Sequence, residues 1–199
     1  MEIYVSINGV LRNFIQKFEY QYKSHFLETE LDDEGTQQEE EPFEYRISYP
    51  IQNDNLMNHY IFESKDEYEY FLFVEFALEI FGYAGISYST SISDLNKLIY
   101  EYKEINFTVV GLDELGKAKS STLFFLSKNG FLGNNIKFIL SKDIDKEWEK
   151  CNIWVTDNKD IIDRCPTGKT AIKFNTDYNA HFNYNKEINN LTLFKDNLS

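Results

Sequence analysis

Short apolar runs and amphipathic segments alternate through the second half of the chain. The apolar runs have the length and composition of buried strands, and the segments between them repeat apolar residues at helical spacing. We expect strands at 106–111, 136–141, 152–156 and 170–175, and helices at 117–128, 143–150 and 158–164. Such alternation predicts a parallel sheet with helices on both faces. The Asn-rich tail is expected to dock 191–194 on this sheet as a last short strand or helix.

A further strand is expected at 2–5, which brings the number to five. Its apolar run I-Y-V is followed by a turn signal at Asn8-Gly9. A strand that stops in a polar loop is typical of the central strand of an α/β sheet, where chemistry collects at the carboxyl ends of the strands. We therefore expect functional groups directly after this strand.

The stretch between residues 14 and 104 has longer helical patterns. We expect helices at 11–26, 65–81 and 94–104, the second capped by Ser64 with Glu67 as the capping-box acid and the third capped by Ser93. The helix at 65–81 is apolar on most faces, which predicts that it packs between layers or against another chain. Alternation at 43–51 predicts an edge strand, with 60–62 as its partner.

The negative net charge of the chain disfavours two classes of partner. With 20 basic and 33 acidic residues the formal net charge is −13, which disfavours nucleic acid and anionic membranes as partners. Nine acidic residues and no basic one fall within 28–44, and this loop is either a solvated insertion or a contact surface for a basic partner. We expect no membrane segment, no secretion signal and no disulfide from Cys151 and Cys165.

The first eleven residues, M-E-I-Y-V-S-I-N-G-V-L, carry a resemblance to a known family. They resemble motif I of the haloacid dehalogenase-like (HAD) hydrolases, in which four apolar residues precede D-x-D-G-[TV]-[LV]. Spacing, glycine and flanking apolar residues match, but Ser6 stands at the position of the nucleophilic aspartate and Asn8 at that of the acid/base aspartate. The resemblance implies a HAD-like (Rossmannoid) α/β fold with a five-stranded parallel sheet, helices on both faces and an inserted α+β cap. The core would be 1–13 with 105–199, and the cap 14–104.

The other motifs of the family are also incomplete. Gly111 stands where the resemblance puts the motif II hydroxyl, and Lys146 or Lys150 is a candidate for the motif III lysine. Asp157, in I-W-V-T-D-N, matches one acid of motif IV. The run A-I-K-F-N-T-D-Y-N at 171–179 resembles the last core strand of phage and bacterial nucleotidase-like members.

These differences remove the groups that the family's chemistry needs. The reaction needs a carboxylate nucleophile, Mg²⁺ held by hard oxygen ligands, and a second carboxylic group that moves a proton. Ser6 has no neighbouring base in the sequence, Asn8 cannot transfer a proton, and Asp157 is nearly alone as a metal ligand. We therefore expect no catalytic residue and no cofactor, with Mg²⁺ only if some activity survives.

Two other patterns in the sequence do not indicate a functional site. The G-K-T at 168–170 lacks the first glycine of a phosphate loop, whose place is taken by Asp163. His25, His59 and His181 show no metal-ligand spacing.

Three hypotheses follow. The first is a catalytically inactive HAD-fold protein that works through contacts with other protein subunits in an oligomeric assembly, in the host cytoplasm or in a phage virion as a ring, collar or tail component; the 17 Phe and 14 Tyr suit such contacts. The second is a residual phosphatase or nucleotidase that uses Ser6 or Asp157. The third is a nucleotide-binding sensor whose cleft is lined by Ser6, Asn8, Asp157 and Asn158.

Overall fold

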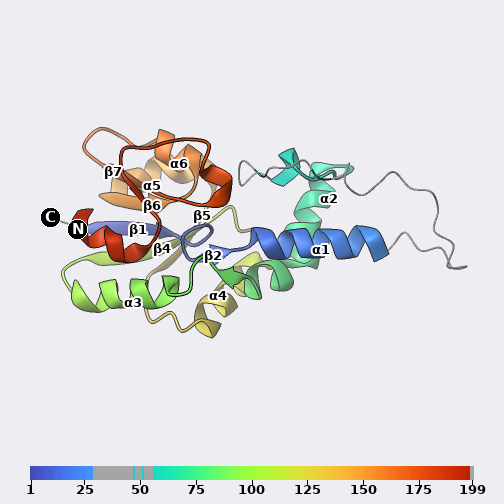
Figure 1. Ribbon diagram of the computed structural model, residues 1–199, viewed down its shortest axis with the longest axis horizontal. Coiled ribbons are helices and arrows are strands. Elements are labelled where there is room, and N and C mark those ends of the chain that lie inside the picture. Colours follow the sequence, from blue (N-terminus) through green and yellow to red (C-terminus); the bar gives the residue numbers. More distant parts are fainter. Residues whose placement is uncertain (29–46, 48–50, 52–55, 198–199) are drawn as a thin grey trace, which may run out of the picture.

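The computed structural model describes residues 1–28, 47, 51 and 56–197, and its centre is a parallel sheet of six strands (Figure 1). The strand order is β5-β4-β1-β6-β7-β8. The strands are β1 (Glu2–Ser6), β4 (Asn106–Leu112), β5 (Ile136–Ile139), β6 (Ile153–Thr156), β7 (Thr170–Phe174) and β8 (Glu187–Ile188). The prediction of a parallel α/β sheet is confirmed. The expected number of five strands is wrong, because the two-residue β8 adds a sixth at the edge.

The first strand lies in the middle of the sheet, as its sequence predicts. β1 pairs in parallel with β4 on one side and with β6 on the other. Both of its faces are buried: Val5 belongs to one hydrophobic cluster and Tyr4 to the other. A run of apolar residues without polar alternation is what a strand buried on both faces requires.

Helices cover both faces of the sheet. One face carries α3 (Ser91–Glu101), α4 (Ala118–Lys128) and the 3₁₀ segment η7 (Leu191–Asn197), whose apolar side chains join the larger cluster with Ile3 and Val5. The other face carries α5 (Ile144–Lys150) and α6 (Lys159–Asp163), which enclose Tyr4, Trp148 and Trp154. In Figure 1, α3 and α4 lie below the sheet and α5 and α6 above it.

Two expected helix starts are wrong. α1 runs over Ile15–Glu28 and not from residue 11, because β2 (Arg12–Asn13) pairs antiparallel with β3 (Gly85–Ile86) and holds that stretch extended. α3 begins at Ser91 with Thr90 as its N-cap, so Ser93 lies inside the first turn, where its hydroxyl donates to the Thr90 carbonyl.

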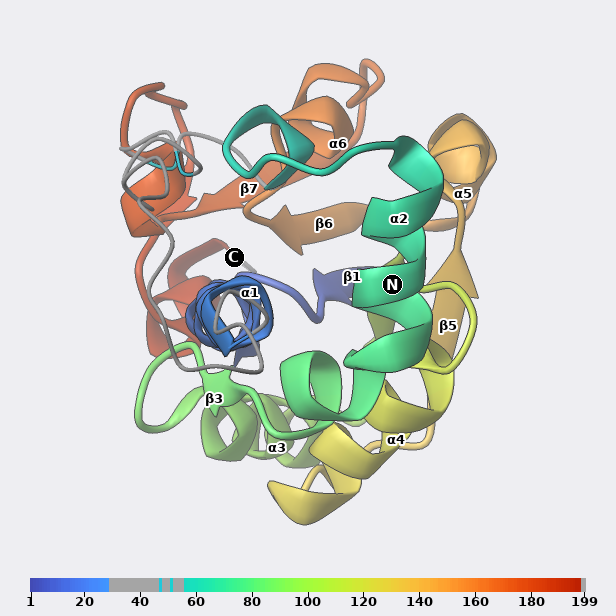
Figure 2. The same cartoon turned by 90° about the vertical axis from the view of Figure 1, so that its right-hand side faces the viewer.

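The expected helix at 65–81 forms in three pieces. Ser64 caps α2 (Lys65–Tyr70), and its hydroxyl accepts a hydrogen bond from Glu67 N at 3.1 Å. The backbone then continues as two π-helical segments, η3 (Phe71–Glu75) and η4 (Leu78–Gly82). Figure 2 shows α2 in front of the end of β1, and α1 seen along its axis beside it. π-Helical turns are rare and are found frequently at functional sites.

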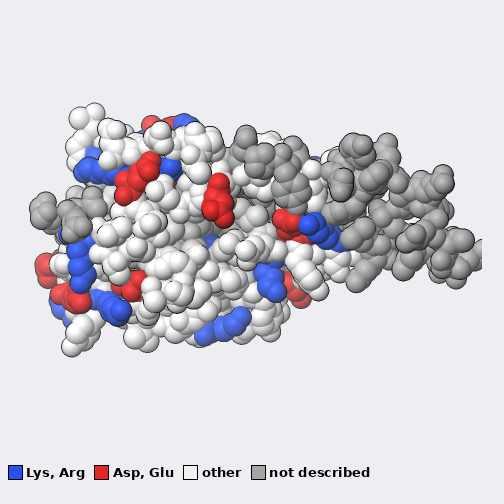
Figure 3. Space-filling view, viewed as in Figure 1, with Lys and Arg blue, Asp and Glu red and all other residues white. Residues whose placement is uncertain are grey.

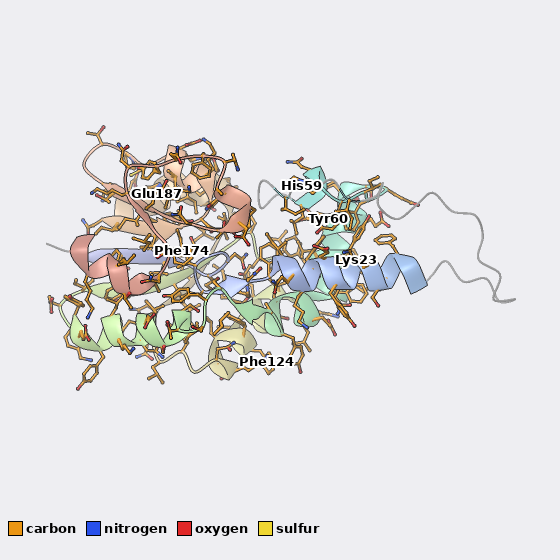
Figure 4. All side chains as sticks on the ribbon, viewed as in Figure 1. Lys23, His59, Tyr60, Phe124, Phe174 and Glu187 are labelled. Atoms are coloured by element: carbon orange, nitrogen blue, oxygen red, sulfur yellow. The ribbon has the colours of Figure 1, made fainter. Side chains whose placement is uncertain are left out.

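An aromatic cluster joins α1 to this helical run. Phe18 lies 4.8 Å from Tyr60 and 5.6 Å from Phe71 between ring centroids, and Tyr22 lies 4.9 Å from Tyr60. Tyr60 can be followed beside α1 in Figure 4. Ile47 forms an isolated antiparallel bridge with Tyr60; the rest of the strand expected at 43–51, except Ile51, and the acidic loop after Glu28 lie outside the described residues.

The division into a core (1–13 and 105–199) and a cap (14–104) stays a prediction. α3, which falls within 14–104, packs on the same sheet face as α4. Within the part of the chain that the structure describes, no helix is both long and apolar enough to cross a membrane.

Candidate functional site

A cleft of about 600 Å³ opens at the carboxyl ends of the central strands. Its walls come from the ends of β1, β4 and β6, from the start of α6, and from α2 and η3 across the opening. The polar groups in its lining are Ser6, Asn8, Lys65, Glu69, Asp113, Ser141, Asp157, Asn158 and Asp160. The structure thus brings the four residues expected at the site, Ser6, Asn8, Asp157 and Asn158, into one cleft.

Ser6 ends β1 and is buried. Its hydroxyl donates to Thr156 Oγ1 at 2.8 Å and accepts from the indole N–H of Trp154 at 3.2 Å. Neither partner is a base, so these contacts hold the hydroxyl in place without activating it as a nucleophile.

Asn8 occupies the turn after β1 and is bound to a buried arginine. Its side-chain oxygen accepts from Arg12 Nε at 2.9 Å and from Arg12 Nη2 at 2.6 Å. The same guanidinium forms an ion pair with Glu114 at 2.6 Å and donates to Thr122 Oγ1 at 2.5 Å. An asparagine with both of these bonds is fixed as an acceptor and cannot shuttle a proton.

The Arg12–Glu114 pair is fully enclosed. Arg12 is completely buried, its guanidinium lying 4.8 Å from the ring centroid of Phe81 and 5.4 Å from that of Phe125. Burial lowers the pKa of Arg12 and raises the pKa of Glu114, while the attraction between the two charges opposes both shifts. The pair joins the turn after β1, the loop after β4 and helix α4.

Position 9 requires a glycine, because its backbone lies directly against the side chain of Asp157. Its φ is +73°, and an added Cβ would overlap the carboxyl group of Asp157. Asp157 follows β6 and is itself buried; the hydroxyl of Tyr178 donates to its carboxylate, and its carbonyl accepts from Asn179 Nδ2 at 3.1 Å. Asn158 caps α6, because its side-chain oxygen accepts from Ile161 N at 3.1 Å.

The position expected for the motif II hydroxyl does not line the cleft. A Cβ on Gly111 would lie 2.8 Å from the ring of Phe138 and 3.0 Å from the carboxyl group of Glu114, so this glycine leaves room for the buried ion pair. The cleft instead receives Asp113, two residues further on, with φ of +51°. Its carboxylate accepts from the amide and the hydroxyl of Ser141.

Neither candidate lysine for motif III reaches the cleft. Lys146 is exposed and pairs with Asp143 at 3.3 Å, and Lys150 donates to Glu147 at 2.7 Å. Lys65 of α2 is the basic residue in the described lining, and it pairs with Glu69 at 3.2 Å.

Asp157 is the acid that the resemblance assigns to a metal site, and no cluster of acids surrounds it. Within the described residues, no three side chains of His, Cys, Asp or Glu gather as a group that could hold a metal ion. The guanidinium of Arg12 lies against Asn8, which places a positive charge beside the position where the family has its second aspartate.

A separate polar cluster lies on the sheet face that carries α5. Lys137 Nζ donates to Tyr4 Oη and to Glu147 Oε2, both at 2.6 Å, and Lys150 binds the other oxygen of Glu147. Burial alone would raise the pKa of Glu147, but hydrogen bonds from Lys137, Lys150 and Tyr4 outweigh burial and lower this pKa to about 2.

Comparison with known proteins defines the class of fold. No protein-family model matches the sequence, and no curated protein matches it. Among solved structures, the chain is similar to a hydrolase of the haloacid dehalogenase-like family from Streptococcus pneumoniae, with a TM-score of 0.59, 10% identity, and coverage of 100% of this chain and 98% of that chain. The protein therefore has an α/β fold, with a parallel six-stranded sheet flanked by helices, that matches the HAD-like Rossmannoid fold.

Proposed function

We propose that this chain is a catalytically inactive protein with a HAD-like fold, which acts by binding and not by turnover. The observation that carries the proposal is the pair of hydrogen bonds from Arg12 to Asn8. They hold the Asn8 side chain as an acceptor beside the buried Arg12–Glu114 ion pair, at the position where the family's chemistry requires a carboxylic acid. An amide at that position supplies neither a transferable proton nor a negative charge for Mg²⁺.

Ser6, at the position of the nucleophile, and Asp157, at the motif IV acid, support the same conclusion. The Ser6 hydroxyl is bound to Thr156 and Trp154 without a base, and the carboxylate of Asp157 accepts a hydrogen bond from Tyr178. The Ser6 bonds hold the ends of β1 and β6 together, and the Asp157 bond holds the end of β6 to the 3₁₀ turn η6 (Asp177–Asn179) after β7. Both are structural roles.

Turnover tests the proposal. Phosphate release from nucleoside monophosphates and p-nitrophenyl phosphate is measured with Mg²⁺ for the native protein, for Asp157→Ala, and for Asp145→Ala, which changes an exposed residue of α5 outside the cleft. We expect the same background rate for all three. Release that is lost in Asp157→Ala and kept in Asp145→Ala would establish a residual phosphatase.

An exposed apolar surface favours contacts with other protein subunits. Leu78 and Tyr83, at the two ends of η4, and Leu123 and Phe124, on α4, are each exposed by 40% or more. The rings of Tyr83 and Phe124 lie 5.3 Å apart, which makes their surface continuous, and Phe124 is seen at the lower margin in Figure 4. Contiguous exposed apolar side chains are typical of protein interaction sites. A virion ring, collar or tail component is one such assembly, and the resemblance of 171–179 to phage and bacterial nucleotidase-like proteins is what suggests it.

The oligomeric state tests this role. Light scattering coupled to gel filtration is expected to show an oligomer that Phe124→Ser dissociates and that Tyr100→Ser, on exposed α3 surface, leaves intact. A strict monomer at all concentrations would argue against self-assembly, and absence from purified particles would argue against the virion setting.

The cleft favours a second candidate, a ligand-binding module without turnover. A volume of about 600 Å³, with both apolar and polar groups in the lining, is within the range of small-molecule sites. Ligand binding raises the melting temperature by mass action, so a thermal shift without ligand consumption would support this role. If no member of a panel of nucleoside monophosphates shifts the melting temperature, the result would contradict this role.

A further inference from the structure

The exposed apolar side chains of η4 and α4 form one continuous surface. The two elements pack against each other. Gly82 lies between Leu78 and Phe124, because an added Cβ would come within 2.8 Å of the first side chain and 3.1 Å of the second. The ring of Tyr83 lies 5.3 Å from that of Phe124. We call the surface formed by Leu78, Tyr83, Leu123 and Phe124 the α4 patch.

Lysines without ion pairs border the α4 patch. Lys117 precedes α4, and Lys119 and Lys128 lie near its two ends; all three are exposed, and none forms an ion pair within the residues that the structure describes. Lys128 Nζ lies 4.8 Å from the ring centroid of Tyr83. α4 contains no acidic residue, and η4 contains one, the half-buried Glu79. Figure 3 shows basic groups beside uncharged surface along the lower margin, where α4 lies in Figure 1.

An apolar surface with a basic border fits a partner that is acidic and carries apolar side chains of its own. The sequence of this chain contains such a segment: residues 28–44 hold nine acidic residues and no basic one, with Leu31 and Phe43 among them. Anionic membranes and nucleic acid fit less well, because a net charge of −13 repels both from the molecule as a whole.

We propose that the α4 patch binds the acidic segment 28–44 of a second copy of this chain. This inference rests on the proposed role in subunit contacts and names the partner of that surface. The three lysines attract the carboxylates of the segment, and the apolar side chains of the patch receive Leu31 and Phe43. The two contacting surfaces differ, so every copy carries one of each. Such a heterologous contact repeats from copy to copy and closes into a ring or continues as a filament.

Charge reversal on both surfaces tests the proposal. The patch variant carries Lys117→Glu, Lys119→Glu and Lys128→Glu, and the segment variant replaces the six acids of 32–34 and 39–41 with lysine. Light scattering coupled to gel filtration is run at a concentration at which the native chain assembles. Each variant alone is expected to be monomeric, because like charges then face each other. An equimolar mixture should recover the assembly, because the reversed patch of one variant meets the reversed segment of the other.

The matched control reverses three other exposed lysines, Lys103, Lys142 and Lys186, which also form no ion pair in the described part of the chain. Lys103 lies 4.5 Å from the ring centroid of Tyr100, so the control loses a cation–π contact like that of Lys128 as well as the same charge. We expect it to assemble like the native chain. Raising the salt from about 0.1 M to about 1 M shortens the Debye length from about 10 Å to about 3 Å and should weaken the native assembly about tenfold.

The outcomes separate this inference from the proposed role. An assembly that Phe124→Ser dissociates but the patch variant leaves intact, or a mixture of the two variants that stays monomeric, would overturn the acidic segment as the partner and leave the contact surface standing. Equal losses in the patch variant and the control would show a general charge effect and overturn the inference. Sedimentation of the native chain, but not of the patch variant, with phosphatidylserine vesicles would assign the patch to a membrane and overturn it too. If the native chain is a monomer at all concentrations, both proposals fail.

Discussion

Replacing Arg12 with methionine tests the contribution of the buried Arg12–Glu114 ion pair to stability. The change keeps much of the side-chain length and removes the charge, so the contacts with the rings of Phe81 and Phe125 lose their cation–π component. It also leaves Glu114, whose carboxyl group is 1% exposed, without its ion-pair partner. Breaking a buried pair by removing one partner costs about 3–5 kcal/mol of the free energy of unfolding.

The assay is urea unfolding, monitored by the fluorescence of Trp148 and Trp154. Both are buried on the sheet face that carries α5 and α6, away from Arg12. Arg12→Met is expected to lose about 3–5 kcal/mol, and Glu114→Met a similar amount because it leaves a buried guanidinium. The double variant should be more stable than the sum of the two losses predicts, by at least about 2 kcal/mol, since neither charge is then left alone.

An exposed ion pair gives the control. Lys159 and Asp163 on α6 lie 2.6 Å apart but are more than half exposed, so Lys159→Met should change the free energy of unfolding by no more than about 1 kcal/mol. Equal losses in Arg12→Met and Lys159→Met, or additive losses in the double variant, would refute the reasoning.

Three further predictions concern the turn after β1, the polar cluster on α5 and the cap of α6. Gly9→Ala should destabilise the fold by several kcal/mol or prevent folding, because the added methyl overlaps a neighbouring carboxyl group, whereas Gly130→Ala, with a φ of +74° and open space around it, should cost only about 1–2 kcal/mol in urea unfolding. The pKa of Glu147, about 2 in the folded state, lies below its unfolded value, so its contribution to stability is complete above a pH of about 4.3 and is lost as the pH falls towards 2. Glu147→Gln should therefore lower the free energy of unfolding at pH 7 and make it fall less steeply as the pH drops below about 4.3. Glu149→Gln, at an exposed position of the same helix, should leave this pH dependence unchanged. Asn158→Ala should cost about 1 kcal/mol by removing the N-cap bond, and no loss would show that the bond is not needed.

The sequence predicts the sheet well because its strands are local features. The apolar run at 3–5 is buried on both faces and takes the central position, and the Asn8-Gly9 signal marks a true turn with Gly9 at positive φ. β8 is missed because two residues in a polar, Asn-rich tail carry no periodicity. Its pairing with β7 is fixed by tertiary contact alone.

The site is predicted only in part, since its most unusual feature depends on contacts across the chain. From the sequence alone, Arg12 would be expected on the surface, as most arginines are. In the structure it is buried against Glu114, which lies 102 positions away. Asp113 is missed for a related reason: its place in the cleft depends on a positive φ and on Ser141, neither of which leaves a pattern in the sequence. Lys146 and Lys150 lie at a plausible spacing, but their helix directs them to other partners.

The most direct test of the central claim is a single-turnover measurement with protein in excess over a phosphomonoester, in the presence of Mg²⁺. At high protein concentration even a slow reaction would consume the substrate. We expect the native protein and Asp157→Ala to leave the substrate intact to the same extent as buffer. Phosphate release by the native protein that Asp157→Ala abolishes would contradict it, and would show that the cleft carries out chemistry despite Ser6, Asn8 and the cation held between Asn8 and Glu114.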